Sequence, residues 1–215
     1  MPIITAIQEQ KKNKKRVSIF LDGEFFKGVS QELILKLNLF KGKQINQNEL
    51  SEILETEKFE YAKSLTLKYL SYKPRTSFEI TKYLKKKNTE GEVIKKIIKE
   101  IENLGLINDD EYARQYASEL IRKGKAGYNV IITKLIKRGI KIEKAKILLN
   151  NLFKEGEELK TAFNLAEKKL KTIKHKEKQK IIKSINDFLI RKGFNYEIVN
   201  KVTRKLWKDY DNSGS

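Results

Sequence analysis

A pattern that recurs about every 50 residues constrains the fold of this chain more than any other feature. The pair Tyr61-Ala62 returns as Tyr112-Ala113, and its third counterpart is Ala162 or Phe163. A second motif, an apolar residue followed by a basic turn, begins at Leu84, Leu135 and Leu189. Self-similarity at a fixed period is typical of stacked supersecondary units. The sequence therefore predicts three tandem repeats.

Each repeat is predicted to contain three helices. From about residue 46 onward the apolar residues follow helical spacing, and the chain has only two prolines. The predicted segments are 59–72, 77–86 and 90–104, then 109–123, 127–138 and 142–154, and finally 157–171, 177–192 and 196–208. One such unit buries a small core, so we expect the repeats to stack into an elongated, curved array.

Residues at the predicted helix ends support this division. Asn88, Gly139 and Gly193 each follow a basic turn, where a left-handed residue closes a helix. Gly105 is expected to end one helix, and Asn108 to cap the next one with Glu111 three residues on. We divide the chain into an N-terminal element at 1–45 and repeats at 46–107, 108–155 and 156–215, the last with a polar tail.

The first 45 residues have a different pattern. Strand-like runs at 17–21 and 24–27 flank Asp22-Gly23, a pair typical of a type I′ hairpin turn. Residues 3–8 are expected to add a third strand, with the basic stretch 11–16 as the connecting turn. The predicted fold class is therefore mainly α, with a small three-stranded antiparallel N-terminal element and a short helix after it.

The composition excludes several kinds of site. The chain has no Cys and one His, so it lacks a disulfide framework, a thiolate nucleophile and a Cys-rich metal site. The motif G-x-x-x-x-G-K-[ST], which binds phosphates, is absent. His175 lies between two lysines and is interpreted as a surface residue. We expect no catalytic residue, no cofactor and no metal.

Asp109, Asp110 and Glu111 allow two interpretations. Consecutive acids can hold Mg²⁺ for phosphodiester chemistry, but acids in a first helical turn also cap N–H groups and favour the helix dipole. We favour the capping role. The sequence also shows no apolar run of about 18 residues and no signal peptide, so we expect a cytoplasmic chain without a membrane partner.

Charge indicates the class of partner. The chain has 47 Lys and Arg against 28 Asp and Glu, for a net charge of +19. Fixed positive charge attracts nucleic acid and displaces its counterions, although an anionic lipid surface or plain solubility would also account for the excess. The run 168–183 contains eight lysines and one acid, and it is either a solvated face or part of such a surface.

Cations also recur at equivalent places in the repeats. Stacked units would align them into a basic stripe along a helical polyanion or a filament groove. Arg75, Arg122 and Arg138 are the first candidates, because a guanidinium binds carboxylate or phosphate with two hydrogen bonds. The candidate contacts are Lys73, Arg75, Lys82, Lys86, Arg122, Lys123, Lys125, Lys134, Lys137, Arg138, Arg191 and Lys192.

The aromatic residues are assigned to structure. Phe78, Tyr83, Tyr112, Tyr116 and Trp207 are expected in the core, because they form no constellation typical of base-stacking sheets.

Four stretches together resemble one bacterial family. They lie at 70–80 (LSYKPRTSFEI), 104–113 (LGLINDDEYA), 135–140 (LIKRGI) and 191–194 (RKGF). In this order and spacing they are similar to the RecX family, which regulates RecA recombinase. The resemblance covers about residues 46–208, and the N-terminal hairpin resembles the extension of Gram-positive members. Tyr128 and Asn129 replace basic residues that are common in the family, which weakens a cationic contact there.

The resemblance implies a cytoplasmic, non-enzymatic protein of three three-helix repeats. Family members bind RecA filaments on DNA, lodge in the filament groove and restrain filament growth, ATP hydrolysis and strand exchange. It also implies direct, sequence-nonspecific binding of single- or double-stranded DNA, and we expect a monomer. Replacing Arg75, Arg122 and Arg138 by Glu is then expected to abolish inhibition without loss of helical circular dichroism.

Two other functions stay open on the residues alone. One repeat could act as a helix-turn-helix that reads a major groove, in which case affinity for an operator would far exceed that for random DNA. A weaker alternative is a basic protein associated with RNA or the ribosome.

Overall fold

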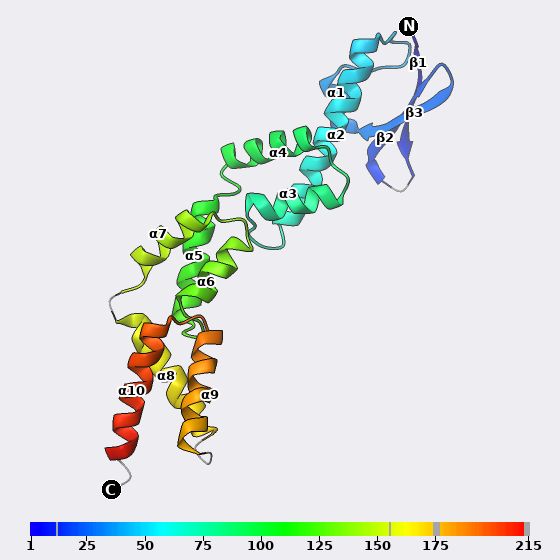
Figure 1. The fold of residues 1–215 in the computed structure, drawn as a ribbon. Coiled ribbons are helices and arrows are strands. Elements are labelled where there is room, and N and C mark those ends of the chain that lie inside the picture. The colour runs from blue at the N-terminus through cyan, green and yellow to red at the C-terminus, as the bar shows by residue number, and fades with distance from the viewer. Residues whose placement is uncertain (12, 155, 174–176, 213–215) are drawn as a thin grey trace. The chain divides into compact units, whose positions relative to one another are not determined.

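The computed structural model describes residues 1–215 except 12, 155, 174–176 and 213–215, so His175 and the last three residues of the polar tail lie outside the described residues. In the described part of the chain, three strands come first and ten helices follow (Figure 1). The mainly α-helical fold class with an N-terminal antiparallel sheet is confirmed.

The N-terminal sheet has the order β1-β2-β3 and consists of β1 (Ile4–Gln10), β2 (Asn13–Leu21) and β3 (Glu24–Ser30). Asp22 and Gly23 have φ values of 49° and 92°, and a type I′ turn requires positive φ at both positions. The predicted hairpin turn is therefore confirmed. The basic stretch 11–16 was expected to be the turn that connects the first two strands, and this is wrong for residues 13–16, because β2 begins at Asn13, which pairs with Gln10 of β1. Ile4, Ile19 and Val29 are fully buried on the face that packs against the short helix α1 (Gln31–Lys36) and the next helix.

Helix α2 (Gln47–Leu70) is longer than the sequence analysis predicted, and the expected start at residue 59 is wrong. The Asn46 side chain accepts the Glu49 N–H while the Glu49 side chain accepts the Asn46 N–H, so a capping box starts the helix early. Ile53 then packs in the core beneath the sheet, whereas Ala62 is buried further along the helix. One continuous helix therefore joins the N-terminal sheet to the first repeat.

The other predicted helices form close to the expected places. Their bounds are α3 (Ser77–Lys86), α4 (Gly91–Asn103), α5 (Asp109–Arg122), α6 (Tyr128–Ile136), α7 (Ile142–Leu152), α8 (Glu157–Lys171), α9 (Lys178–Arg191) and α10 (Tyr196–Asn212). Asn88, Gly139 and Gly193 have φ values of 58°, 87° and 90°, so the left-handed residues predicted after α3, α6 and α9 are confirmed.

The repeat is visible in the burial of small side chains. The first helix of each repeat buries two of them, one turn apart, and these pairs are Ala62 and Thr66, Ala113 and Ala117, and Ala162 and Ala166. Small residues let neighbouring helices approach closely. The third counterpart of the Tyr-Ala pair is therefore Ala162, since Phe163 is only half-buried. Leu84, Leu135 and Leu189 are fully buried at the matching place on the second helices.

The expected burial of the aromatic residues is wrong in part. Phe78 is exposed, with 46% of its surface accessible, and the other four side chains are half-buried. The cores are filled mainly by aliphatic and small side chains, with Phe194 as a buried aromatic residue in the third repeat. Tyr116 and Trp207 are partly buried and pack against these cores. Tyr83 stacks on Tyr69, with ring centroids 4.1 Å apart.

The chain divides into two compact units. The first comprises Met1–Lys73 and Ile80–Leu104, and the second comprises Pro74–Glu79 and Gly105–Ser215. The first unit thus holds the N-terminal sheet with most of the first repeat, and the second holds the other two repeats. The division passes through α3, whose first turn belongs to the second unit.

Candidate interaction surface

The candidate cations of the first unit are exposed. Lys73 lies in the connection between α2 and α3, and Lys82 and Lys86 lie one turn apart on α3. Lysine side chains at this spacing project from the same side of a helix. They form a short basic edge on α3.

The start of α3 is held by a contact that we call the α3 joint, formed by residues 76–78, Asp109 and residues 138–139. The Thr76 hydroxyl donates to the Arg138 carbonyl oxygen at 2.7 Å. The Ser77 N–H and hydroxyl donate to the two Asp109 carboxylate oxygens at 2.8 and 2.5 Å. The first turn of α3 is therefore bound to the second repeat, which explains its place in the second unit.

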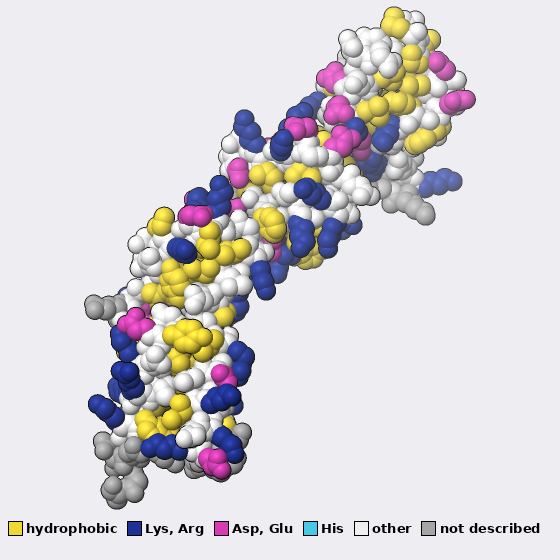
Figure 2. Space-filling view, viewed as in Figure 1, with side chains coloured by type: hydrophobic (Ala, Val, Ile, Leu, Met, Phe, Trp, Pro, Cys, Tyr) yellow, Lys and Arg dark blue, Asp and Glu magenta, His cyan; other side chains and the backbone are white. Residues whose placement is uncertain are grey.

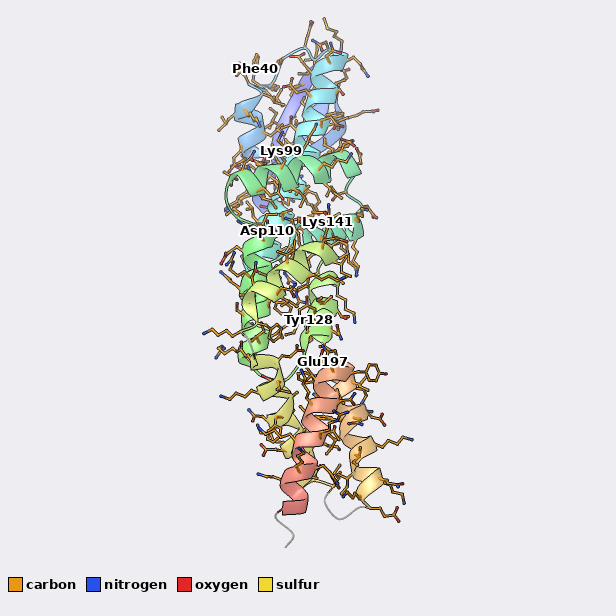
Figure 3. All side chains as sticks on the ribbon, turned by 60° about the vertical axis from the view of Figure 1, so that its left-hand side comes forward. Phe40, Lys99, Asp110, Tyr128, Lys141 and Glu197 are labelled. Atoms are coloured by element: carbon orange, nitrogen blue, oxygen red, sulfur yellow. The ribbon has the colours of Figure 1, made fainter. Side chains whose placement is uncertain are left out.

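The acidic run at 109–111 has roles that differ from residue to residue. Asn108 caps α5 by accepting the Glu111 N–H at 3.0 Å, as predicted. Asp109, however, caps α3 and not its own helix, so its expected role was assigned to the wrong helix. Asp110, labelled in Figure 3 at the start of α5, forms an ion pair with Lys144 at 2.8 Å. Within the described ranges, no group of three or more His, Asp or Glu side chains could hold a metal ion.

Arg138, one of the three arginine candidates, is occupied by its own unit. Its Nε donates to the Tyr112 hydroxyl at 2.7 Å, and its guanidinium carbon lies 4.1 Å from the centroid of the Tyr116 ring. Burial disfavours the charged form, but the Tyr112 hydrogen bond, the two tyrosines and Glu79 outweigh it and raise the pKa of Arg138. The side chain therefore stays charged and is held in one orientation.

Arg75 also has a partner at the α3 joint. Its Nη1 lies 3.7 Å from Glu79 Oε1, and its side chain is mostly buried. Glu79 accepts the Thr76 N–H as well, so this acid links the arginine to the cap of α3. Of the three arginines, only Arg122 is exposed.

A second contact of the same kind, the α6 joint, is formed by residues 127–129, Glu158 and residues 192–193. The Gly127 N–H donates to the Lys192 carbonyl oxygen at 2.8 Å, and the Asn129 N–H donates to the Gly193 carbonyl oxygen at 3.0 Å. The Tyr128 N–H, at the start of α6 (Figure 3), donates to Glu158 Oε1 at 2.8 Å. The two joints thus have the same construction. The following repeat supplies an acid from its first helix, Asp109 or Glu158, and a backbone carbonyl from the turn after its second helix.

The α6 joint brings two groups of candidate cations together. Arg122 ends α5, Lys123 is its C-terminal cap and Lys125 lies in the connection to α6, while Arg191 and Lys192 end α9. Lys123 is paired with Glu119 at 2.5 Å, and Lys192 Nζ lies 5.5 Å from the centroid of the Phe188 ring. Arg122, Lys125 and Arg191 are exposed, and Figure 2 shows Lys and Arg side chains scattered over the visible surface of this unit, between hydrophobic side chains.

Two further candidates lie on α6 and at its end. Lys134 is half-buried on the helix, and Lys137 is exposed at the C-terminal cap. The exposed side of α9 adds an open cleft of about 360 Å³ lined by Lys180, Lys183, Ser184, Asp187 and Arg191. Arg191 therefore belongs both to this cleft and to the surroundings of the α6 joint. The extension of these groups into one stripe stays a prediction.

Sequence reasoning missed the two joints. Ser77 and Asp109 are 32 residues apart, and Tyr128 and Glu158 are 30 residues apart. A sequence signal could have found them. An acid lies in the first turn of α5 and again in the first turn of α8, whereas α3 and α6, the second helices of the preceding repeats, have no acid at their own N-cap position.

A helix that spans a membrane must be both long and apolar. None of the described helices is long and apolar enough to cross a membrane.

Three family models match the chain. They describe the N-terminal domain of the regulatory protein RecX at residues 2–46, its first three-helix domain at 62–100 and its third three-helix domain at 156–203. The last two matches cover parts of the first and third repeats.

Relatives and solved structures with the same name are similar over most of the chain. "Regulatory protein RecX" of Clostridioides difficile is 33% identical over 98% of this chain and 100% of its own length. That of Staphylococcus aureus is 34% identical over 96% of this chain and 75% of its own. A crystal structure of regulatory protein RecX has a TM-score of 0.74 at 26% identity and covers 95% of this chain and 100% of its own. The crystal structure of RecX from Lactobacillus salivarius has a TM-score of 0.64 at 28% sequence identity. It covers 70% of this chain and 97% of its own.

Proposed function

The chain belongs to the RecX family of regulatory proteins, and from this premise we propose that it binds filaments of RecA recombinase on DNA and inhibits their growth, ATP hydrolysis and strand exchange. The proposed activity is regulatory and not catalytic. A monomer acting in the cytoplasm, where the recombinase works, is part of the proposal.

The observation that carries the proposed surface is the gathering of cations around the α6 joint. Arg122, Lys125 and Arg191 are exposed there, and hydrogen bonds between backbone groups hold their two segments together. Backbone hydrogen bonds restrict the segments before any partner binds, which lowers the entropy cost of association. A phosphate or a carboxylate of the filament would meet several positive groups at once.

The α3 joint supports a different role for Arg75 and Arg138. Their side chains already contact Glu79, Tyr112 and Tyr116, so they position the start of α3 as well as add positive charge. We therefore place direct contact first on the exposed cations: Lys73, Lys82, Lys86, Arg122, Lys125, Lys137 and Arg191. Lys123, Lys134 and Lys192 are second, because they are paired or half-buried.

ATP hydrolysis by the RecA of the same organism on single-stranded DNA tests this function. The protein is titrated far below the recombinase concentration at fixed salt. We expect hydrolysis to fall at such ratios, because one molecule bound in a filament affects many recombinase subunits. Inhibition that needs stoichiometric protein and disappears with modest added salt would show competition for DNA instead, since nonspecific phosphate binding is steeply salt-dependent.

A DNA-binding regulator of the helix-turn-helix class is the alternative. In such motifs the recognition helix presents side chains to base edges. The exposed side of α4 has mixed charge, with Glu92 and Lys95 in an ion pair at 2.7 Å, which is a poor match to a DNA groove. Comparison of operator and random DNA at one salt concentration separates the two functions, since base readout gives a large affinity ratio and the filament modulator does not.

A basic protein associated with RNA or the ribosome is a weaker alternative that rests on net charge alone. Capture of the recombinase and of RNA from the same extract, with the purified protein as bait, separates it from the filament modulator.

A further inference from the structure

The tip of the β1–β2 hairpin is the most basic short segment of the first unit. Residues 11–16 read KKNKKR, with five cations and no acid. Lys11 follows the last residue of β1, and residues 13–16 are the first residues of β2, at the end of the sheet opposite to the Asp22-Gly23 turn. Residue 12 lies outside the described residues. This segment is separate from the repeat cations described above.

The strand register leaves three residues near the tip without partners on β1. Glu9 pairs with Val17, but the next residue, Gln10, pairs with Asn13. Lys14, Lys15 and Arg16 lie between these two partners and pair with no residue of β1. Extra residues on one strand bend it locally. Of the three, Lys14 and Lys15 are exposed, whereas Arg16 pairs with Ser30 of β3 and is half-buried.

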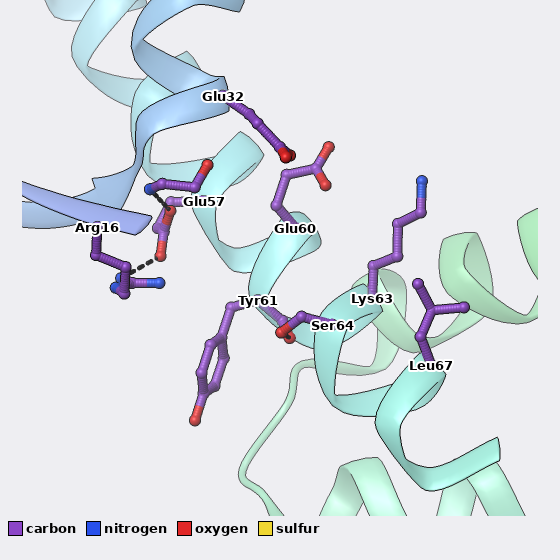
Figure 4. Close-up of a pocket in the computed structure, with 9 residues that line it drawn as sticks. Arg16, Glu32, Glu57, Glu60, Tyr61, Lys63, Ser64 and Leu67 are labelled. Carbon is purple, nitrogen blue, oxygen red and sulfur yellow. Dashed lines mark hydrogen bonds and ion pairs between the residues drawn. The ribbon is translucent and has the colours of Figure 1, made fainter. Parts of the chain in front are cut away.

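Arg16 anchors the base of the tip. Its Nη2 donates to the Gly28 carbonyl oxygen at 2.6 Å. The same nitrogen donates to Glu57 Oε1 at 2.6 Å, and the Ser30 N–H donates to the other Glu57 oxygen at 3.3 Å (Figure 4). Glu57 is only 4% exposed on α2. A charge-assisted pair at this depth is short and directional, so Arg16 fixes the start of β2 to α2.

The remaining lysines of the tip are available to a partner. Lys11, Lys14 and Lys15 are exposed, and no carboxylate of the described residues forms an ion pair with them. Figure 2 shows Lys and Arg side chains standing out at this end of the sheet. Three ammonium groups without counter-charges repel one another, and an external polyanion relieves that repulsion.

We propose that the tip of the β1–β2 hairpin binds the sugar–phosphate backbone of nucleic acid through Lys11, Lys14 and Lys15. A two-stranded β-ribbon fits the width of a DNA groove, and lysines act as point charges that accept any arrangement of neighbouring phosphates. An acidic protein surface would need a matched pattern of carboxylates, whereas phosphates recur at regular, close spacing along every strand. The proposal deepens the proposed function by adding a DNA contact in the first unit.

The test replaces the three lysines together as K11Q/K14Q/K15Q in the full chain. Binding to a labelled poly-dT oligonucleotide and to a random duplex is followed by fluorescence anisotropy over a range of salt concentrations. Each lost phosphate contact reduces the salt slope by about 0.7 on a single strand and about 0.9 on a duplex. We expect affinity at low salt to fall at least about tenfold, with a slope that is smaller by about 2.

The control K68Q/K96Q/K99Q removes the same charge from exposed lysines of α2 and α4 in the same unit. It is expected to keep the wild-type slope. The variant K11R/K14R/K15R keeps the charge and is expected to bind as the wild type does. Equal loss of affinity in both Gln variants, or an unchanged slope in the hairpin variant, would overturn the proposal, because net charge alone would then explain binding.

Inhibition of the recombinase separates this proposal from the function on which it rests. Wild-type protein that fails to inhibit ATP hydrolysis contradicts the proposed function, while the anisotropy comparison still decides the hairpin contact. If the hairpin variant binds DNA as well as the wild type but no longer inhibits, the tip contacts an acidic protein surface, and the assignment to nucleic acid is wrong.

Discussion

Glu158 lies half-buried where α8 meets the start of α6, and its carboxylate accepts the Tyr128 N–H at 2.8 Å. Burial raises the pKa of this carboxyl, and the hydrogen bond from Tyr128 lowers it by less. In the folded state the group therefore binds its proton more tightly than in the unfolded chain. Protonation of Glu158 therefore contributes to the free energy of unfolding. This contribution is complete at a pH below the pKa of the group in the unfolded chain, and it is lost as the pH rises through the pKa in the folded state.

Replacing Glu158 by Gln should thus have an effect that depends on pH. Gln keeps an oxygen for the Tyr128 N–H and has no charge to desolvate. We expect the free energy of unfolding of E158Q, relative to wild type, to be higher at pH 7 than at pH 4 by less than about 1 kcal/mol, because solvent screens a half-exposed group. Urea unfolding at both pH values measures this difference.

E197Q is the control of opposite sign. The hydrogen bond from Lys201 lowers the pKa of Glu197, so the stability that it contributes is lost as pH falls through the folded pKa. Relative to wild type, E197Q should be less stable at pH 7 than at pH 4. The same sign for both variants would contradict a raised pKa of Glu158.

Arg138 shows why only cations with exposed side chains are suitable for testing contact with a partner by mutation. Its side chain bonds to Tyr112 and lies over Tyr116, while its carbonyl accepts the Thr76 hydroxyl. A change to Glu would place a negative group against these partners and disturb the α3 joint. The replacement of Arg75, Arg122 and Arg138 together therefore cannot separate lost contact from lost structure, and exposed residues make a cleaner test.

At the scale of elements, the two joints show how each repeat is completed by the one that follows it. The first turns of α3 and α6 have N–H groups without partners inside their own helices. The following repeat supplies Asp109 or Glu158 for one of them and the carbonyl of Arg138 or Lys192 for another group at the same end. Because each joint satisfies a helix end, adjacent repeats stabilise one another.

Gly193 makes the α6 joint sensitive to substitution. Its φ is 90°, and a Cβ there would lie 2.4 Å from the Val130 backbone nitrogen. We expect Gly193→Ala to lower the free energy of unfolding by about 2 kcal/mol or more, from backbone strain and the clash together. Chemical denaturation monitored by circular dichroism gives this value.

Gly91→Ala is the matched control, because Gly91 lies at the start of α4 with open space around its Cα. Alanine favours helix, so stability should stay unchanged or rise by up to about 1 kcal/mol. A Gly193→Ala variant as stable as Gly91→Ala would show that the α6 joint does not restrict the backbone.

At the scale of the whole molecule, a net charge of +19 makes any single cation a small part of the attraction to a polyanion. Position must therefore be separated from total charge. The triple change R122E/K125E/R191E reverses exposed cations around the α6 joint, and K141E/K146E/K168E reverses as many exposed cations elsewhere in the second unit.

We expect R122E/K125E/R191E to raise the concentration for half-maximal inhibition of RecA ATP hydrolysis at least about tenfold more than the control does, because charge reversal at a contact adds repulsion to the lost attraction. The titration is run at constant salt, and circular dichroism verifies that both variants keep their helices. Equal loss in the two variants would remove the α6 joint from the proposed surface.

The sequence by itself determined the features that depend on near neighbours along the chain. Asp22-Gly23 predicts a type I′ turn, and Asn108 and Gly193 predict a helix start and a helix end, because each requirement is set within a few residues. The repeat period then places the helices of successive units. The start of α2 was missed, although the Asn46 and Glu49 capping box is local and readable.

The tertiary structure alone decided which distant groups meet. Asp109 bonds to Ser77 and not within its own helix, Arg16 meets Glu57 across 41 residues, and Arg138 is covered by two tyrosines. Helical periodicity states which face of a helix is apolar, but the polar partner at a helix end depends on how the next helix packs against it. For the same reason, the candidate cations could be named from sequence, whereas their availability to a partner could not.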